Sequence, residues 1–436
     1  MRDTIFALAT APGRAGVAVV RVSGTDAGRA IRTLTARPVP VPRTAMPARF
    51  RDAGGVPIDR GLVLFFQAPS SFTGEDVAEF HVHGGRAVLE ALLSALAALG
   101  LRPAQAGEFT RRAVENGKLD LTRAEAIADL VDAETEAQRR QALRQYDGGL
   151  ADLYEDWRAR LIRAGAWAEA AIDFSEEDLP DGTLARTRAA ISEILEQIQN
   201  HTNDSRRGEL LRDGLCLTVI GPPNAGKSSL VNALARRDVA IVAVTPGTTR
   251  DVIEVRMDLG GYPVTLADTA GLRSASEAVE AEGVRRALAR ADTAELVLLL
   301  LDGSAFDPMA GLPPATRADL TVWNKSDLRW PEARKGLAIS LKSGDGLDAL
   351  VAALTAKVRD RLESPGEAPA LTRRRHRHAL EQAAHALETA LAAPADRPEL
   401  LAEDLRLALR ALGRLTGRVD IEELLDAVFK DFCIGK

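Results

Sequence analysis

One octapeptide constrains this chain more than any other feature. Residues 221–228 read Gly-Pro-Pro-Asn-Ala-Gly-Lys-Ser and fit the P-loop pattern G-x-x-x-x-G-K-[ST]. The apolar run 215–220 before it predicts a strand, and 228–234 predict the start of a helix. Backbone N–H groups in such a loop, with the positive end of the helix, bind phosphate. We therefore expect Lys227 to contact the β- and γ-phosphates of a nucleotide and Ser228 to bind Mg²⁺.

Three further motifs follow in the order that a GTPase requires. Thr249, in the loop 247–251, is expected to close over the γ-phosphate and bind Mg²⁺. Asp268 begins Asp-Thr-Ala-Gly at the end of an expected strand and would hold Mg²⁺ through water, while the Gly271 N–H contacts the γ-phosphate. Asp327 ends Asn-Lys-Ser-Asp, and its carboxylate can accept two hydrogen bonds that guanine donates and adenine cannot. The four motifs together predict GTP binding.

The expected nucleotide ligands come from these motifs and from a last one at 340–342. We expect the Asn324 side chain to contact the base edge and the Lys325 stem to pack along the base. The full set is Asn224, Ala225, Gly226, Lys227, Ser228, Ser229, Thr245, Thr248, Thr249, Asp268, Thr269, Ala270, Gly271, Asn324, Lys325, Asp327, Ser340 and Lys342.

The rest of the sequence predicts a multidomain chain of the α/β plus α class. Strands are expected at 16–24, 61–66 and 76–83, which makes 1–118 an α/β domain, with a Pro-rich loop or edge at 38–47. Helical periodicity marks 119–212, including helices at 150–171 and 184–211, and Thr122 with Glu125 fit a capping box. Strands and helices alternate through 213–364, which predicts a Ras-like, doubly wound and mostly parallel sheet inserted into the helical domain. The helical pattern returns over 365–436.

Composition narrows the class of protein. The 436 residues carry a formal net charge of −6, which disfavours a general nucleic-acid coat. Two cysteines, Cys216 and Cys433, suit a reducing compartment, and no signal-peptide pattern or long apolar run is visible, so we expect a soluble cytoplasmic protein. Cys216 reads as a core residue. His81 and His83 share a strand face; satisfied polar histidines are the favoured interpretation and a metal site is the alternative.

Stretches in all three expected domains resemble the MnmE (TrmE) family of tRNA-modifying GTPases. They are 11–16 with 21–24, 73–76, 83–85, 116–121, 173–174 and the ending Phe-Cys-Ile-Gly-Lys at 432–436. The resemblance implies an N-terminal domain that dimerises and binds 5-formyl- or methylene-tetrahydrofolate, a split helical bundle and an inserted G domain. It also implies a partner, MnmG, which uses FAD and NADH and joins the homodimer in a heterotetramer or larger complex. Together they build an aminomethyl or carboxymethylaminomethyl group on carbon 5 of the tRNA wobble uridine, with the folate as one-carbon donor.

The resemblance carries over to particular residues. Leu272 stands where Ras-type GTPases have a water-orienting Gln, and the family's Glu for that task matches Glu280; a solvated helix start is the alternative. K⁺ and G-domain dimerisation are implied in place of an arginine finger. The expected potassium ligands are Asn224, Ala243, Thr245 and Thr248, the expected Mg²⁺ ligands Ser228 and Thr249, and the implied folate contacts Arg21, Glu79, Lys118 and Lys436. The expected catalytic residues are Glu280, Lys227 and Cys433.

Several interpretations stay open at the level of sequence. Cys433 is either a functional thiol beside the folate or a small core residue. The basic run 373–377 either contacts tRNA phosphate or begins an exposed helix. Leu341 departs from the alanine usual in the last GTPase motif. The alternative function is a potassium-dependent GTPase switch in ribosome assembly, without modification chemistry.

Overall fold

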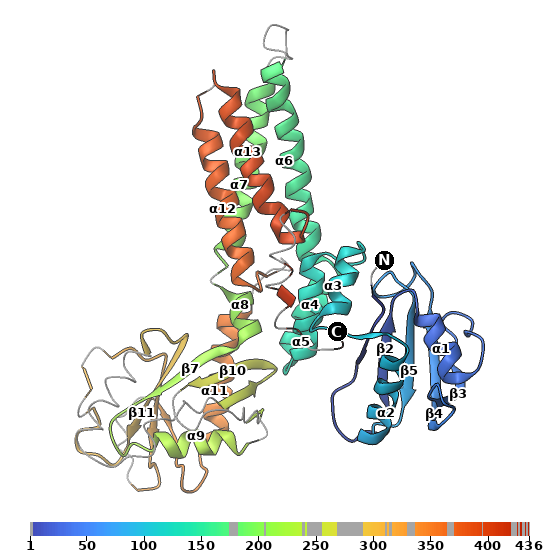
Figure 1. Ribbon diagram of the computed structural model, residues 1–436. Coiled ribbons are helices and arrows are strands. Elements are labelled where there is room, and N and C mark those ends of the chain that lie inside the picture. The colour runs from blue at the N-terminus through green and yellow to red at the C-terminus, as the bar shows by residue number, and fades with distance from the viewer. Residues whose placement is uncertain are drawn as a thin grey trace. The chain divides into compact units, whose positions relative to one another are not determined.

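The computed structural model describes residues 3–173, 182–204, 206–237, 240–241, 255–267, 291–309, 312–313, 316–328, 336–363, 370–394, 396–419, 425, 428–429, 432 and 435 (Figure 1). Packing divides the chain into two units. The first comprises Met1–Ala128, Tyr146–Leu184 and Ala393–Lys436, and the second Asp129–Gln145 and Ala185–Ala392.

The first unit contains a six-stranded sheet in the order β3-β4-β5-β2-β1-β6. All neighbouring pairs are antiparallel except β1 and β6. Apolar residues of α1 and α2 share one core with the sheet. The three expected strands are confirmed, and the Pro-rich stretch leads into the edge strand β3. The bounds are β1 Ile5–Leu8, β2 Ala18–Ser23, α1 Ala27–Thr35, β3 Met46–Arg51, β4 Pro57–Phe66, β5 Val77–Val82, α2 Arg86–Ala98 and β6 Arg102–Pro103.

The other helices assigned wholly or mostly to the first unit are α3, α4, α6 and, near the end of the chain, α13. Buried residues recur along α6 at helical spacing, among them Tyr154, Trp157 and Leu161, and this face packs against α13. The expected capping box is wrong: Thr122 lies inside α4, and Asp120 caps it by accepting the Arg123 N–H at 3.0 Å. The bounds are α3 Glu108–Glu115, α4 Leu121–Asp132, α6 Gly149–Asp173 and α13 Pro398–Thr416.

The second unit has its own helices and a seven-stranded sheet. The single helix expected over 184–211 is two, α7 and α8, because the chain turns at Arg206, whose φ is +60°. Helix α7 lies beside α12, joined by hydrogen bonds from Arg188 to the Leu391 carbonyl and from Gln199 to Glu388, both 2.8 Å. The bounds are α5 Glu136–Tyr146, α7 Thr183–Thr202, α8 Arg207–Asp213 and α12 Arg374–Ala392.

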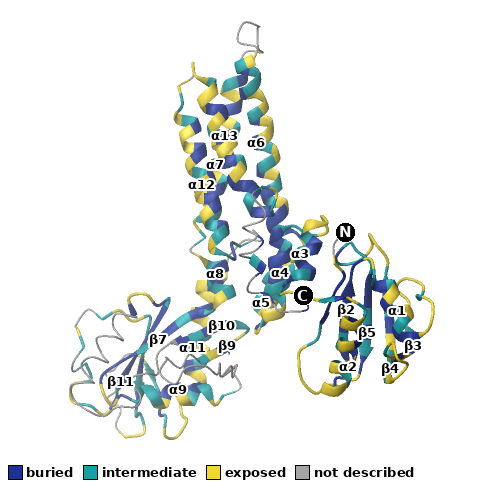
Figure 2. Cartoon of the chain, viewed as in Figure 1, coloured by how far each residue is buried: buried dark blue, intermediate teal, exposed yellow. Residues whose placement is uncertain are grey.

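The seven strands run in the order β13-β12-β11-β7-β10-β9-β8. The first five are parallel, as the sequence predicts, and β9 and β8 extend the sheet antiparallel. Leucines of α9 and α11 pack on the sheet around a buried core, and the central strands β7 and β11 are mostly buried, dark blue in Figure 2. The bounds are β7 Leu215–Ile220, α9 Lys227–Ala235, β8 Ala240–Ile241, β9 Val255–Leu259, β10 Tyr262–Ala267, β11 Leu296–Asp302, β12 Leu320–Asn324, β13 Leu337–Ala338 and α11 Leu347–Leu362.

Candidate functional site

The P-loop follows the central strand β7, which pairs with β10 on one side and β11 on the other. Two positions in the loop accept only glycine. A Cβ on Gly221 would lie 2.1 Å from the Leu300 carbonyl oxygen, and one on Gly226 would lie 2.4 Å from the Asn324 amide nitrogen. Asn224 has a φ of +62°, a left-handed conformation that asparagine tolerates better than most residues. The predicted phosphate cradle is therefore built from backbone that larger residues would block.

The P-loop lysine is held against the loop itself. The Lys227 ammonium donates to the carbonyls of Gly221 at 2.9 Å and Pro222 at 2.8 Å. Ser228 is half-buried in the first turn of α9, and Ser229 is exposed. A hydroxyl at the positive end of a helix, beside a held ammonium, suits a phosphate and its Mg²⁺.

Asn324 connects two of the predicted motifs. Its side-chain nitrogen donates to the Ala225 carbonyl in the P-loop at 2.8 Å, and its side-chain oxygen accepts the Leu341 N–H at 3.2 Å. The residue is 4% exposed. The Leu341 side chain packs against the core of the sheet. The departure from alanine at this position therefore adds apolar contact within the domain.

The two charged residues of Asn-Lys-Ser-Asp are also held by neighbours. Lys325 pairs with Asp302 at 2.6 Å, and Asp327 accepts a hydrogen bond from the Ser340 hydroxyl at 2.7 Å. Burial opposes ionisation of Asp302, but hydrogen bonds from Lys325 and Ser304 lower its pKa below the usual value. The exposed Asp327 is thus oriented by Ser340, at the carboxyl edge of the parallel strands where nucleotides bind in such sheets.

Part of the predicted site lies outside the described residues. This holds for the expected GTP, Mg²⁺ and K⁺ contacts Ala243, Thr245, Thr248, Thr249, Asp268, Thr269, Ala270 and Gly271, and for Glu280, Cys433 and Lys436. Of the described contacts, Ala225 bonds Asn324 and Asp327 bonds Ser340, while Lys342 is exposed beside Leu341.

The predicted folate residues of the first sheet form a pair. Arg21 on β2 lies opposite Glu79 on β5, and Arg21 Nε donates to Glu79 at 3.0 Å. The guanidinium also lies 5.8 Å from the ring centroids of Phe72 and Phe109. His81, one of the two strand histidines, lies 3.5 Å from Glu79. The pair is part-buried and flanked by aromatic rings, which suits a flat polar heterocycle.

Lys118 reaches the same sheet through the loop 73–75. A Cβ on Gly74 would lie 3.2 Å from the Lys118 Cε, and Thr73 bonds the Ser23 hydroxyl at 2.7 Å beside Arg21. The chain end also approaches this sheet, because a Cβ on Gly435 would lie 2.1 Å from the Leu8 carbonyl oxygen.

Comparisons with known proteins agree with this organisation. The family model "GTP-binding protein TrmE N-terminus" matches residues 4–118, and "MnmE helical domain" matches 121–433. The proteins named tRNA modification GTPase MnmE from Parvibaculum lavamentivorans and Paramagnetospirillum magneticum are 57% and 55% identical, with 100% of both chains covered in each case. The chain belongs to the MnmE family. The predicted MnmE resemblance and the multidomain α/β plus α fold class are confirmed.

A solved structure is also similar to part of this MnmE-family chain. The G domain of the FeoB iron transporter of T. maritima matches 34% of this chain and 99% of that one, at 23% identity and a TM-score of 0.23. Among the described residues, no helix is long and apolar enough to cross a membrane.

Two features of this MnmE chain escaped the sequence analysis. Asp302 closes the strand β11 and pairs with Lys325; its place at a strand end, before glycine, could have suggested it. Arg112 is 4% exposed and forms ion pairs with Glu75 and Glu108 at 3.0 Å each. Glu75 also accepts a hydrogen bond from Ser23 on β2, the strand that carries Arg21, and no local sequence motif predicts this network.

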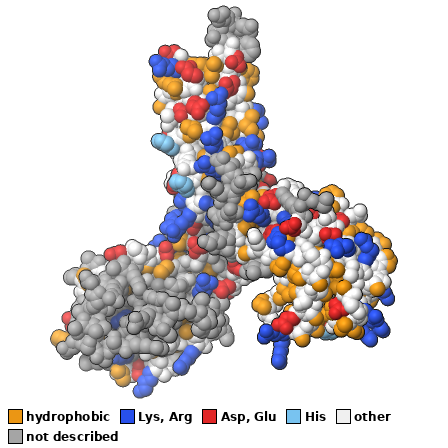
Figure 3. All heavy atoms as spheres, in the orientation of Figure 1, with side chains coloured by type: hydrophobic (Ala, Val, Ile, Leu, Met, Phe, Trp, Pro, Cys, Tyr) orange, Lys and Arg blue, Asp and Glu red, His pale blue; other side chains and the backbone are white. Residues whose placement is uncertain are grey.

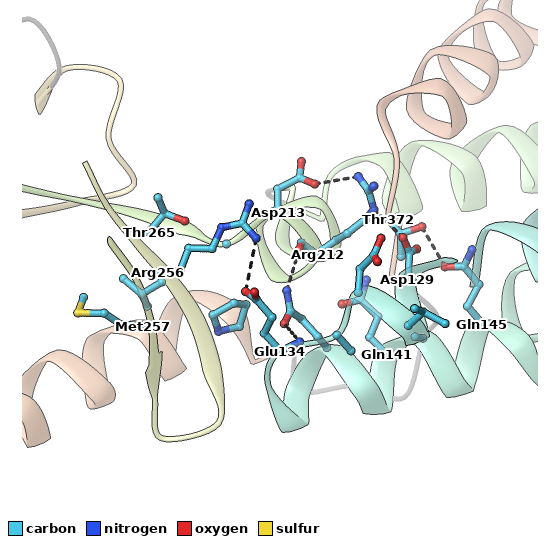
Figure 4. Close-up of a pocket in the computed structure, with 18 residues that line it drawn as sticks. Asp129, Glu134, Gln141, Gln145, Arg212, Asp213, Arg256, Met257, Thr265 and Thr372 are labelled. Atoms are coloured by element: carbon cyan, nitrogen blue, oxygen red, sulfur yellow. Dashed lines mark hydrogen bonds and ion pairs between the residues drawn. The ribbon is translucent and has the colours of Figure 1, made fainter. Parts of the chain in front are cut away.

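A cavity of about 610 Å³ lies elsewhere in the second unit, lined by α5, α8 and the β9–β10 hairpin (Figure 4). Glu134 points toward Arg256 at 3.5 Å, and Gln138 donates to the Arg212 carbonyl at 2.9 Å. The Gly261 carbonyl at the hairpin tip accepts the Ala137 N–H at 3.0 Å. None of the lining residues belongs to the P-loop or to 324–327, so the cavity is separate from the nucleotide site.

Proposed function

We propose that this chain hydrolyses GTP and, with a flavin-dependent partner, modifies carbon 5 of the tRNA wobble uridine. The product carries an aminomethyl or carboxymethylaminomethyl group, and a tetrahydrofolate supplies the carbon. One observation carries the proposal: a chain that matches the MnmE family from end to end holds both a guanine-selecting P-loop site and a paired Arg21–Glu79 site on a separate sheet.

The nucleotide site supports hydrolysis through positioning and charge. Lys227 lies at the P-loop, where its ammonium can contact the β- and γ-phosphates. Asp327, oriented by Ser340, would select guanine. Ser228, Thr249 and Asp268 would hold Mg²⁺, which supplies charge neutralisation when bound. The K⁺ ligands would be Asn224, Ala243, Thr245 and Thr248, whose neutral oxygens suit a hard monovalent cation. Glu280 would orient the attacking water.

The first sheet supports folate binding by charge and shape. The Glu79 carboxylate can accept from the amino edge of a pterin, while the hydrogen bond from the Arg21 guanidinium holds that carboxylate in place. Lys118 and Lys436 would hold the carboxylates of the folate tail. The folate supplies a one-carbon unit when bound, and Cys433 would act as a thiol beside it.

The proposed organisation follows from these assignments. Residues 1–118 form the folate-binding and dimerisation domain, 119–212 and 365–436 the helical domain, and 213–364 the G domain. The partners are a second copy of the chain, tRNA and an MnmG-like flavoprotein that binds FAD and NADH. The proposed location is the cytoplasm.

Nucleoside analysis of tRNA tests the proposal directly. A strain that lacks this chain should lose the modified wobble uridine, and the wild-type gene should restore it while Lys227→Ala does not. Normal wobble uridines in the deletion strain, together with altered ribosome profiles, would favour the ribosome-assembly switch instead.

A further inference from the structure

Three segments far apart in the sequence bring an unusual number of arginines together. They are 136–145, 206–213 and 372–378, and they contain ten arginines against the carboxylates of Glu136, Glu209 and Asp213. The whole chain, in contrast, has a net charge of −6. A local positive excess in an acidic protein points to an anionic partner.

The structure packs the three segments against one another. Gln141 on α5 donates to the Gly208 carbonyl on α8 at 3.1 Å, and the Thr372 hydroxyl donates to Gln145 at 2.9 Å. A Cβ on Gly208 would lie 2.2 Å from the Leu371 carbonyl oxygen, so α8 touches the chain just before α12. The arginines of all three segments therefore belong to one region, and Figure 3 shows Lys and Arg side chains gathered over α8 and the start of α12.

Most of these arginines are engaged within the protein. Arg373 and Arg212 share Asp129 at 2.6 and 2.8 Å, and Arg377 pairs with Asp204 and Glu209 at 2.8 Å each. Arg139 and Arg140 pair with Glu136, and Arg206 with Glu209. Two of the four arginines in the basic run 373–377, Arg373 and Arg377, are thus structural, because they hold the segments together.

Of the other four arginines, Arg375 is half-buried and engaged within the protein, and three remain for a partner. Arg144 and Arg374 are exposed and Arg207 is half-buried, and the described residues place no carboxylate within ion-pair distance of any of them. Each lies within two residues of a direct contact between the segments: Arg144 beside Gln145, Arg207 beside Gly208, and Arg374 two residues after Thr372. Guanidinium groups on such a held scaffold donate several hydrogen bonds to phosphate without first being ordered.

The surface chemistry favours RNA over a protein or a membrane. Docking surfaces for proteins and membranes carry exposed apolar or aromatic anchors. Of the described large hydrophobic residues that are exposed, none lies within the three segments, and one, Tyr146, directly follows the first segment at the end of α5. Phosphodiester contacts require only charge and hydrogen-bond donors.

We propose that Arg144, Arg207 and Arg374 form a contact surface for the phosphate backbone of tRNA. This inference rests on the proposed function for the identity of the RNA. It concerns docking of the tRNA body and not recognition of the wobble base, because phosphate contacts carry no base information.

Fluorescence anisotropy with labelled tRNA and the full chain tests the surface. The triple variant Arg144→Gln/Arg207→Gln/Arg374→Gln should bind tRNA at least about tenfold more weakly, and the slope of log K against log salt should fall by about 3. The matched control Arg32→Gln/Arg163→Gln/Arg410→Gln removes three exposed arginines of the first unit and should bind as wild type. Equal losses in both triples, or none in either, would overturn the proposal.

Further variants separate docking from folding and from the overall function. The triple Arg→Lys variant keeps the charge and should retain most of the affinity, and Arg374→Gln alone should lower the salt slope by about 1. If the Gln triple melts early and Arg374→Gln binds normally, the surface is structural. The rate of GTP hydrolysis is the independent check on folding, and it should stay near wild type in these variants. A deletion strain with normal wobble uridines would remove the proposed function, while the binding assay would still decide whether this surface holds RNA. Binding to anionic vesicles in preference to tRNA would assign it to a membrane and overturn the inference.

Discussion

The Asn324 side chain donates to the Ala225 carbonyl and so ties the end of β12 to the P-loop, 99 residues earlier in the chain. The same amide accepts the Leu341 N–H, so one buried residue holds three segments of the nucleotide site. Besides the pairing of β7, β11 and β12, this one side chain therefore fixes the P-loop relative to the guanine-selecting motif.

Asn324→Ala should weaken GDP and GTP binding by about tenfold or more. The change leaves the Ala225 carbonyl and the Leu341 N–H without this partner, and the loss of a buried hydrogen bond costs about 1–3 kcal/mol. Isothermal titration with each nucleotide measures the effect. The exposed Asn203→Ala serves as control. Unchanged affinity in Asn324→Ala would show that other contacts fix the loop.

GTP hydrolysis should be faster in K⁺ than in Na⁺ at equal ionic strength. The Asn224 side-chain oxygen is the expected K⁺ ligand. Asn224 has a backbone φ of +62°, a conformation that alanine disfavours, so an alanine substitution also introduces backbone strain. Asn224→Gly removes the oxygen without this strain, so both Asn224→Ala and Asn224→Gly should erase the K⁺ preference in a phosphate-release assay. Equal wild-type rates in the two salts would contradict the assignment.

Glu280→Ala should lower kcat for GTP hydrolysis by roughly 10²-fold, the scale for a positioned acid–base group. Nucleotide affinity should stay near normal, because the carboxylate acts on water and not on the nucleotide. Stopped-flow binding and single-turnover hydrolysis separate the two effects. Glu277→Ala and Glu282→Ala are the matched controls. A normal rate in Glu280→Ala and a slow rate in one of the controls would assign the water-orienting role to that control's glutamate instead.

Cys433→Ser should leave GTP hydrolysis and the melting temperature near wild type but abolish tRNA modification. The thiol is expected to act beside the folate, and its neighbour Phe432 is buried against Phe429 near Gly107. Nucleoside analysis and thermal melting on one preparation give both readouts. A large fall in melting temperature would instead assign Cys433 to the core.

Folding stability should fall as the pH drops from about 6.5 toward 4. Desolvation lowers the pKa of His201 to about 4, helped by His376 and Arg377 and opposed by Asp204. Because an unfolded histidine titrates near 6.5, the unfolded state binds more protons between these values, and stability present above pH 6.5 is lost below it. The loss from pH 8 to pH 5 should be about 2 kcal/mol. Urea unfolding at both pH values should show this loss in wild type and in the exposed-site control His378→Gln, but not in His201→Gln.

Turn residues and apolar runs in the sequence predicted those elements whose structure depends on neighbouring residues. The P-loop, the strands around it and the paired hairpin β9–β10 carry their own turn residues and apolar runs, so their positions could be derived from the sequence. The prediction of the α4 cap failed because Asp120, two residues before Thr122, offers an equally good oxygen. Sequence alone does not decide between two capping residues so close together.

Long-range pairing could not be predicted in the same way. Arg373 and Arg377 belong to the run interpreted as either a phosphate contact or an exposed helix start, but their carboxylates lie 244 and 173 residues earlier, at Asp129 and Asp204. The pairing of Lys325 with Asp302 was missed for the same reason, since each charge is unremarkable until β11 and β12 align. A run of basic residues shows which side chains can bind an anion. Only the fold shows which of them are already paired with a carboxylate of the same chain.

The close contact between Gly208 and Leu371 also bears on how such a chain could have arisen and can be taken apart. Everything between these residues leaves and returns at one point of backbone contact, as a loop closed at its base. An insertion at this junction leaves the two ends of the opened helical connection next to each other. A short linker from Gly208 to Leu371 would remove the inserted domain together with α8 beyond Gly208 and would connect α7 to α12.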